Sequence, residues 1–164
     1  LRKLGFKIIH LTTKLLPAWH EILERLGMNV TTLPRDVSTC WNSTFDMIQC
    51  ALSHREAIDA VTQQRDLGLR HLELTDQEWE IAGQLRDVLK ILKDATLFFS
   101  RSTPNLATVI PAMDLIDEKL TTYSQNHRFL PSIHAAVGLG KRTLNRYYQL
   151  MDTSEVYRIA MGKC

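Results

Sequence analysis

The chain has 164 residues, of which 45% are hydrophobic and 23% are charged, and its formal net charge is +2. This length and composition are typical of a globular domain with a buried core and argue against intrinsic disorder. The longest apolar runs span only a few residues, too short for a membrane helix of about 20 residues. The start, Leu1-Arg2-Lys3-Leu4, lacks the pattern of a secretory signal, so we expect an intracellular protein with no membrane partner.

The first part of the chain combines helical and strand-like patterns. A helix fits residues 2–26, where Pro17 should kink or divide it. Residues 30–33 and 36–41 are rich in β-branched side chains and indicate short strands. A further helix, capped near Ser43, is expected to continue to about residue 64.

The clearest helix start lies at Thr75, which can cap the helix while Glu78 reaches back to its backbone amide. Leu74 and Trp79 are placed to pack together beside this cap. The spacing of the apolar residues predicts a long helix over 75–101.

Two later helices are marked by proline at their expected starts. Thr103 and Pro104 suit the cap and first position of a helix that continues to about Tyr123. Pro131 begins another helix, which runs to about Met151. The sequence therefore predicts a mainly α fold, a bundle-like arrangement of five or six helices with one or two short strands.

No cysteine or histidine pattern indicates a metal or a disulfide framework. The three cysteines, Cys40, Cys50 and Cys164, are not closely spaced, and the six histidines are scattered. Asp36 and Asp46 could suggest a metal site, but we interpret them as a turn residue and a first-turn acid of a helix. We expect no cofactor, no metal and no small-molecule substrate.

The most specific pattern is D-V-S-T-C-W-N-S-T-F-D-M over residues 36–47. It resembles the D-x-x-T-R-W-N-S-T-x-x-M segment of hAT-superfamily DNA transposases, a class of transposable-element proteins, and of their domesticated relatives. Residues 74–79 begin a stretch that resembles the family's L-T-x-x-E-W pattern. The resemblance covers roughly residues 33–160.

The resemblance implies an RNase H-like core interrupted by a large helical insertion. An Asp-Asp-Glu triad would hold two divalent metal ions, with the aspartates before the tryptophan motif and the glutamate after the insertion. That triad would fall outside this chain, so we expect a fragment that is not an enzyme by itself. On this basis residues 1–42 are predicted to be a remnant of the RNase H-like core and residues 43–164 the helical insertion domain.

The resemblance also implies a role for Trp41. In the family this tryptophan is thought to stack on a base as a flanking DNA end forms a hairpin, and Asn42 follows it in the motif. Cys40 stands where the family usually has an arginine, and a thiol has neither the charge nor the planar donors needed to contact phosphate. The alternative is that Trp41 fills the junction between strand and helix.

A second candidate DNA contact lies on the last long helix. Lys141, Arg142 and Arg146 place basic groups on adjoining turns and could contact phosphates, although a solvated helix face is the commoner explanation. No basic cluster in the sequence is typical of a nuclear import signal, so a nuclear location follows only from the resemblance.

Two functions are expected from these patterns. One is a transposase-derived, non-catalytic protein that still binds DNA. The other is a domesticated or decayed helical module that binds protein partners and has no DNA role. The first 45 residues are predicted to expose apolar surface and to favour self-association.

Overall fold

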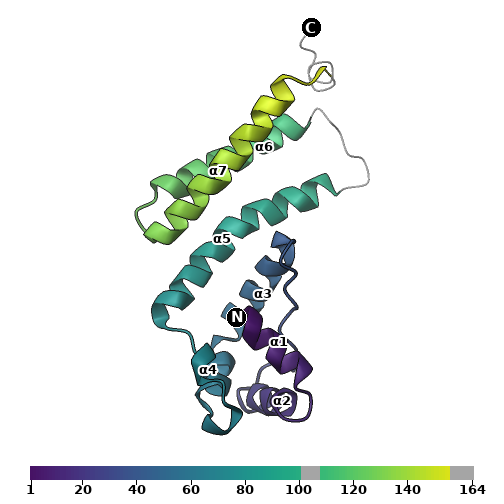
Figure 1. Ribbon diagram of the computed structural model, residues 1–164, viewed down its shortest axis with the longest axis vertical. Coiled ribbons are helices and arrows are strands. Elements are labelled where there is room, and N and C mark those ends of the chain that lie inside the picture. The colour runs from purple at the N-terminus through teal and green to yellow at the C-terminus, as the bar shows by residue number, and fades with distance from the viewer. Residues whose placement is uncertain (101–107, 156–164) are drawn as a thin grey trace. The chain divides into compact units, whose positions relative to one another are not determined.

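The structure is a computed structural model that describes residues 1–100 and 108–155 (Figure 1). Within these ranges the chain forms seven α-helices and two short 3₁₀-helices. The helices are α1 (Arg2–His10), α2 (Leu15–Arg25), α3 (Trp41–Ser53), α4 (Arg55–Gln63), η1 (Arg65–Leu67), η2 (Arg70–Leu72), α5 (Asp76–Phe99), α6 (Val109–Gln125) and α7 (Pro131–Asp152). The predicted mainly α fold is confirmed.

The prediction of short strands at residues 30–33 and 36–41 is wrong, because the described part of the chain contains no strand. A strand forms only where a neighbouring strand satisfies its backbone groups. Here other partners do so: the Trp19 indole N–H donates to the Thr31 carbonyl at 2.7 Å, and the Val37 N–H donates to the Ser43 hydroxyl at 2.8 Å. The segment is therefore a loop held by side chains.

The described chain divides into two compact units, Leu1–Arg86 and Asp87–Cys164. We call them the N-terminal unit and the C-terminal unit, and α5 contributes residues to both. Residues 1–42 lie in the same unit as α3 and α4. The division of the chain into a core remnant and an insertion domain at residue 42 stays a prediction.

Pro17 divides the first predicted helix, as expected. α1 ends at His10 and α2 begins at Leu15, so that Pro17 is the third residue of α2. A proline is tolerated there because the first-turn N–H groups have no partner within the helix, whereas its ring would clash with a preceding helical turn. The break lets the two helices pack against each other.

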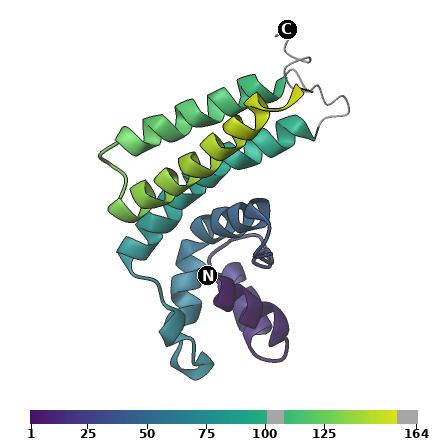
Figure 2. The same ribbon diagram turned by 45° about the horizontal axis from the view of Figure 1, so that its top comes forward.

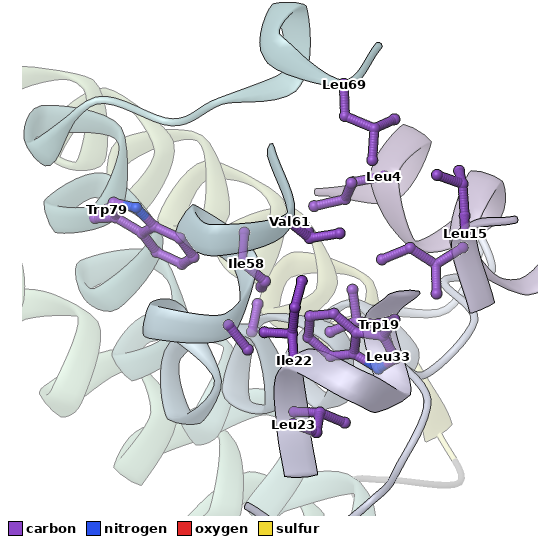
Figure 3. Packing of buried hydrophobic residues seen from close by; sticks show 13 residues of the cluster. Leu4, Leu15, Trp19, Ile22, Leu23, Leu33, Ile58, Val61, Leu69 and Trp79 are labelled. Carbon is purple, nitrogen blue, oxygen red and sulfur yellow. The ribbon is translucent and has the colours of Figure 1, made fainter. Parts of the chain in front are cut away.

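One hydrophobic cluster holds the N-terminal unit together (Figure 3). It draws on α1, α2, α3, α4, the start of α5 and the loops between them. Its fully buried members include Leu4, Ile8, Trp19, Ile22, Leu23, Leu33, Ile58, Val61, Leu69 and Trp79. Both buried indoles have hydrogen-bond partners, since the Trp79 N–H donates to Asp59 at 3.2 Å and Trp19 donates to the loop carbonyl named above.

The predicted capping box at the start of α5 is confirmed. The Thr75 N–H donates to the Glu78 carboxylate at 2.8 Å, and the Glu78 N–H donates to the Thr75 hydroxyl at 3.3 Å. Leu74 packs against the hydrophobic cluster that contains Trp79. The described helix ends at Phe99, two residues before the predicted end.

The helix predicted from Ser43 to about residue 64 differs in two respects. It begins two residues earlier, at Trp41, and it is interrupted at His54, which separates α3 from α4. Ser43 is thus inside the first turn, where its hydroxyl serves the preceding loop and does not cap the helix.

In the C-terminal unit, α6 and α7 form an antiparallel helical hairpin (Figure 2). Its buried side chains are Met113, Ile116 and Leu120 from α6 with Ile133, Val137 and Met151 from α7. Pro131 is the first residue of α7, as predicted. The predicted helix start at Thr103 and Pro104 lies outside the described residues.

The core of the N-terminal unit gives a stability prediction. Leu23→Ala should lower the free energy of unfolding by about 2–5 kcal/mol, because it leaves a cavity among fully buried side chains. Trp19, Trp41 and Trp79 all belong to this unit, so tryptophan fluorescence during denaturant unfolding reports on it. Leu11→Ala, at a side chain that is 49% exposed, should change stability by less than about 1 kcal/mol. Equal losses in the two variants would contradict this description of the core.

Candidate nucleic-acid interface

The tryptophan motif forms a loop that a buried carboxylate closes onto α3. Asp36 accepts hydrogen bonds from the Thr44 hydroxyl at 2.7 Å and the Ser43 hydroxyl at 3.3 Å, and it forms an ion pair with Arg2 of α1. The Asp36 side chain has no exposed surface, whereas that of Arg2 is 59% exposed. We call this arrangement the Asp36 clasp, defined by Arg2, Asp36, Ser43 and Thr44.

The clasp also determines how readily Asp36 ionises. Burial disfavours the charged form, but the hydrogen bonds from Thr44, Arg2 and Ser43 and the charge of Arg2 outweigh it and lower the pKa of this carboxyl. Asp36 is therefore a structural anion that joins α1, the loop and α3. The sequence pattern predicts only a turn residue at this position.

Ser43 holds the backbone of the same loop. Its hydroxyl accepts from the Val37 N–H and lies 2.8 Å from the Cys40 carbonyl oxygen. These bonds fix the turn that precedes α3. They replace the backbone pairing that a strand would have supplied.

The loop presents Trp41 at the first position of α3, where the side chain is 52% exposed. About half of the indole surface is therefore accessible to a ligand. The neighbouring Cys40 is also exposed. Asn42 is partly buried, and its side-chain oxygen is buried with no hydrogen-bond partner among the described residues.

The three predicted basic residues of α7 do not share one environment. Lys141 bonds to Thr121 and lies 3.4 Å from the Asp117 carboxylate, so it joins α7 to α6. Arg142 and Arg146 are exposed, and the Arg146 guanidinium lies 5.5 Å from the ring centre of Tyr147.

The five predicted site residues thus fall into two groups on two units. Trp41 and Asn42 belong to the N-terminal unit, and the α7 residues belong to the C-terminal unit. Sequence reasoning missed the clasp, because its partner Arg2 is 34 residues away from Asp36. The signal that could have indicated it is the presence of an acid and two adjacent hydroxyl residues within one nine-residue motif.

Over residues 1–100 and 108–155, no group of three or more His, Cys, Asp or Glu side chains is arranged to hold a metal ion. No helix in the same ranges is long and apolar enough to cross a bilayer.

These features define a mainly α-helical domain. A family model described as the ZBED1 RNase-like helical domain matches residues 6–88, about half of the 164 residues. The chain belongs to this family. The matched segment ends two residues beyond Arg86, the last residue of the N-terminal unit. No curated protein and no solved structure matches the chain.

The clasp gives a pH-dependent prediction. Because the pKa of Asp36 is lower in the folded chain than in the unfolded one, its ionised form stabilises the fold at neutral pH, and this contribution is lost as the pH falls below about 4. Asp36→Asn should lower the free energy of unfolding at pH 7 by about 1.5–3 kcal/mol, the range for hydrogen bonds to charged groups.

Urea unfolding of both proteins from neutral to acidic pH checks this prediction. The difference between them should shrink as the pH falls. Glu24→Gln, at an exposed acid of α2, should behave as the wild type does. A difference that stays constant with pH would show that the carboxylate charge is not what stabilises the loop.

Proposed function

We propose that the chain contacts DNA through Trp41, which stacks on an unpaired base. The observation that carries the proposal is the exposure of this indole, 52%, at the end of a loop fixed by the buried Asp36. Stacking of a base on an aromatic side chain contributes about 1–3 kcal/mol. A fixed loop favours binding further, because less conformational freedom is lost when the complex forms.

The proposed role is binding without catalysis. Its support is the resemblance to hAT transposases, in which the three catalytic acids lie outside the tryptophan motif and the helical insertion. The family match supports a transposase-related origin for the N-terminal unit. Arg142 and Arg146, both exposed on α7, are proposed to add phosphate contacts.

Anisotropy titrations with two labelled DNAs test the Trp41 proposal. One is a duplex closed by a hairpin with unpaired bases, and the other is a linear duplex with the same stem. The wild type should prefer the hairpin, and Trp41→Ala should weaken hairpin binding by about 5- to 150-fold, equivalent to the loss of one stacked base.

Two variants serve as controls in this assay. Trp41→Phe should keep most of the preference, because a smaller aromatic ring still stacks. Leu11→Ala removes a side chain of similar exposure, 49%, and should leave binding unchanged. Equal hairpin affinities for the wild type and Trp41→Ala would reject the stacking role.

A salt series tests the contribution of α7. Each phosphate contact removed should reduce the slope of log affinity against log salt by about 0.9. The double variant Arg142→Gln, Arg146→Gln should therefore show a shallower slope. Lys141→Gln should keep the wild-type slope, since Lys141 is engaged with α6. An unchanged slope in the double variant would place the phosphate contacts elsewhere.

The alternative is a protein-interaction module with no DNA role, and an apolar groove of the C-terminal unit favours it. The groove has a volume of about 670 Å³ and lies between α6 and the residues of α5 from Asp87 onward. Ile91, Phe98 and Leu115 contribute to its wall. The partner that fits such a groove is an amphipathic helix. No DNA binding even at low salt would leave only a helical interaction module or a decayed fragment.

Self-association of the chain would change the apparent DNA affinity, so it has to be measured alongside the binding assays. Five large apolar side chains within the first 45 residues are about half exposed: Phe6, Leu11, Val30, Val37 and Trp41. Their exposure supports the self-association expected from the sequence. Sedimentation velocity of each sample, over the concentrations used for titration, measures it directly.

A further inference from the structure

A cleft of about 360 Å³ lies between α1 and the loop that leads into the Asp36 clasp. Arg2, Lys3 and Lys7 of α1 line it together with Arg35 of the loop. The cleft lies entirely within the N-terminal unit.

The charges in the cleft are not balanced. Asp36 is the acidic residue among its lining residues, and it is already paired with Arg2. Helix α1 contains no acidic residue. The side chains of Lys3 and Arg35 make no hydrogen bond or ion pair with any described residue, and both are exposed.

Lys7 is partly engaged, because its ammonium lies 3.4 Å from a ring nitrogen of His71. That contact brings no carboxylate to the cleft. Lys3, Lys7 and Arg35 therefore remain as three cationic side chains without an anionic partner among the described residues.

The apolar lining of the cleft strengthens the electrostatic attraction that these charges exert on an anion. Met47 of α3 lines it and is 6% exposed, and Ile9 adds a further apolar side chain. Phe6 and His10 also line it, with ring centres 4.0 Å apart. Apolar walls lower the local dielectric, and a charge acts more strongly there than in open water.

We propose that this cleft binds a phosphate group. Arginine offers a planar fork of donors that matches phosphate oxygens, and lysine adds a compact positive charge. The phosphate can belong to a nucleic-acid backbone or to a free phosphorylated compound, since both present the same oxygens. The cleft is separate from the Trp41 stacking surface and does not depend on it.

Calorimetric titration of the full chain tests the proposal with two probes at constant ionic strength. Inorganic pyrophosphate represents the free source, and a short single-stranded oligothymidylate represents the backbone. The decisive variant is the double substitution Lys3→Gln, Arg35→Gln, which removes the two unpaired cations. Neither side chain bonds to another helix or loop, so the double variant should fold as the wild type does. Denaturant unfolding followed by tryptophan fluorescence verifies this.

A matched variant removes the same charge elsewhere in the unit. Arg25 and Arg70 are also exposed and lie outside the hydrophobic cluster, so Arg25→Gln with Arg70→Gln is the control. The cleft variant should lose affinity by roughly tenfold or more, and the control should stay near the wild type. Trp41→Ala should leave pyrophosphate binding unchanged, which separates this proposal from the stacking proposal.

The outcomes distinguish the two sources. Binding of pyrophosphate that the cleft variant loses supports a site for free phosphate compounds. Binding of the oligonucleotide alone, lost in the same variant, supports a backbone contact. Equal losses in the cleft and control variants would overturn the proposal, because total charge would then account for binding. Failure of both probes to bind the wild type would overturn it as well.

Discussion

The buried carboxylate of Asp36 is the interaction on which the loop architecture of the N-terminal unit depends. It lies at the meeting point of three segments that have no strand pairing to hold them: the loop, which contains Asp36 itself, α1 through Arg2, and α3 through Ser43 and Thr44. A single anion with several donors fixes all three, because each donor would otherwise require water. The same residue thereby determines the position of Trp41 and one side of the cationic cleft.

Local signals predicted much of the helical structure. The capping box at Thr75 and Glu78 and the prolines at 17 and 131 act through backbone atoms within a few residues, so the sequence alone contains their effect. The strands failed for the opposite reason. β-Branched side chains permit an extended backbone, but only a partner strand makes it a strand, and here side chains supply the hydrogen bonds.

The candidate site was predictable only in part. A motif of twelve residues identified Trp41, yet it could not show that the indole is half exposed. The cleft and the clasp combine α1 with a loop some 30 residues later, and their formation depends on the turn before α2 and on the packing of Leu33 into the core. Lys141 contacts α6 whereas Arg142 and Arg146 are exposed, and this difference depends on which face of α7 packs against α6. Such tertiary information is not contained in helical spacing.

Helix α5 has a consequence for how this protein can be divided. It is continuous over Asp76–Phe99, while the boundary between the two units falls after Arg86. Truncation at that boundary would cut a helix in mid-course and leave its last carbonyl groups without donors, at a point with no cap. A junction placed before Thr75 would keep the capping box but would separate Trp79 from the core of the N-terminal unit, so both units depend on one continuous α5.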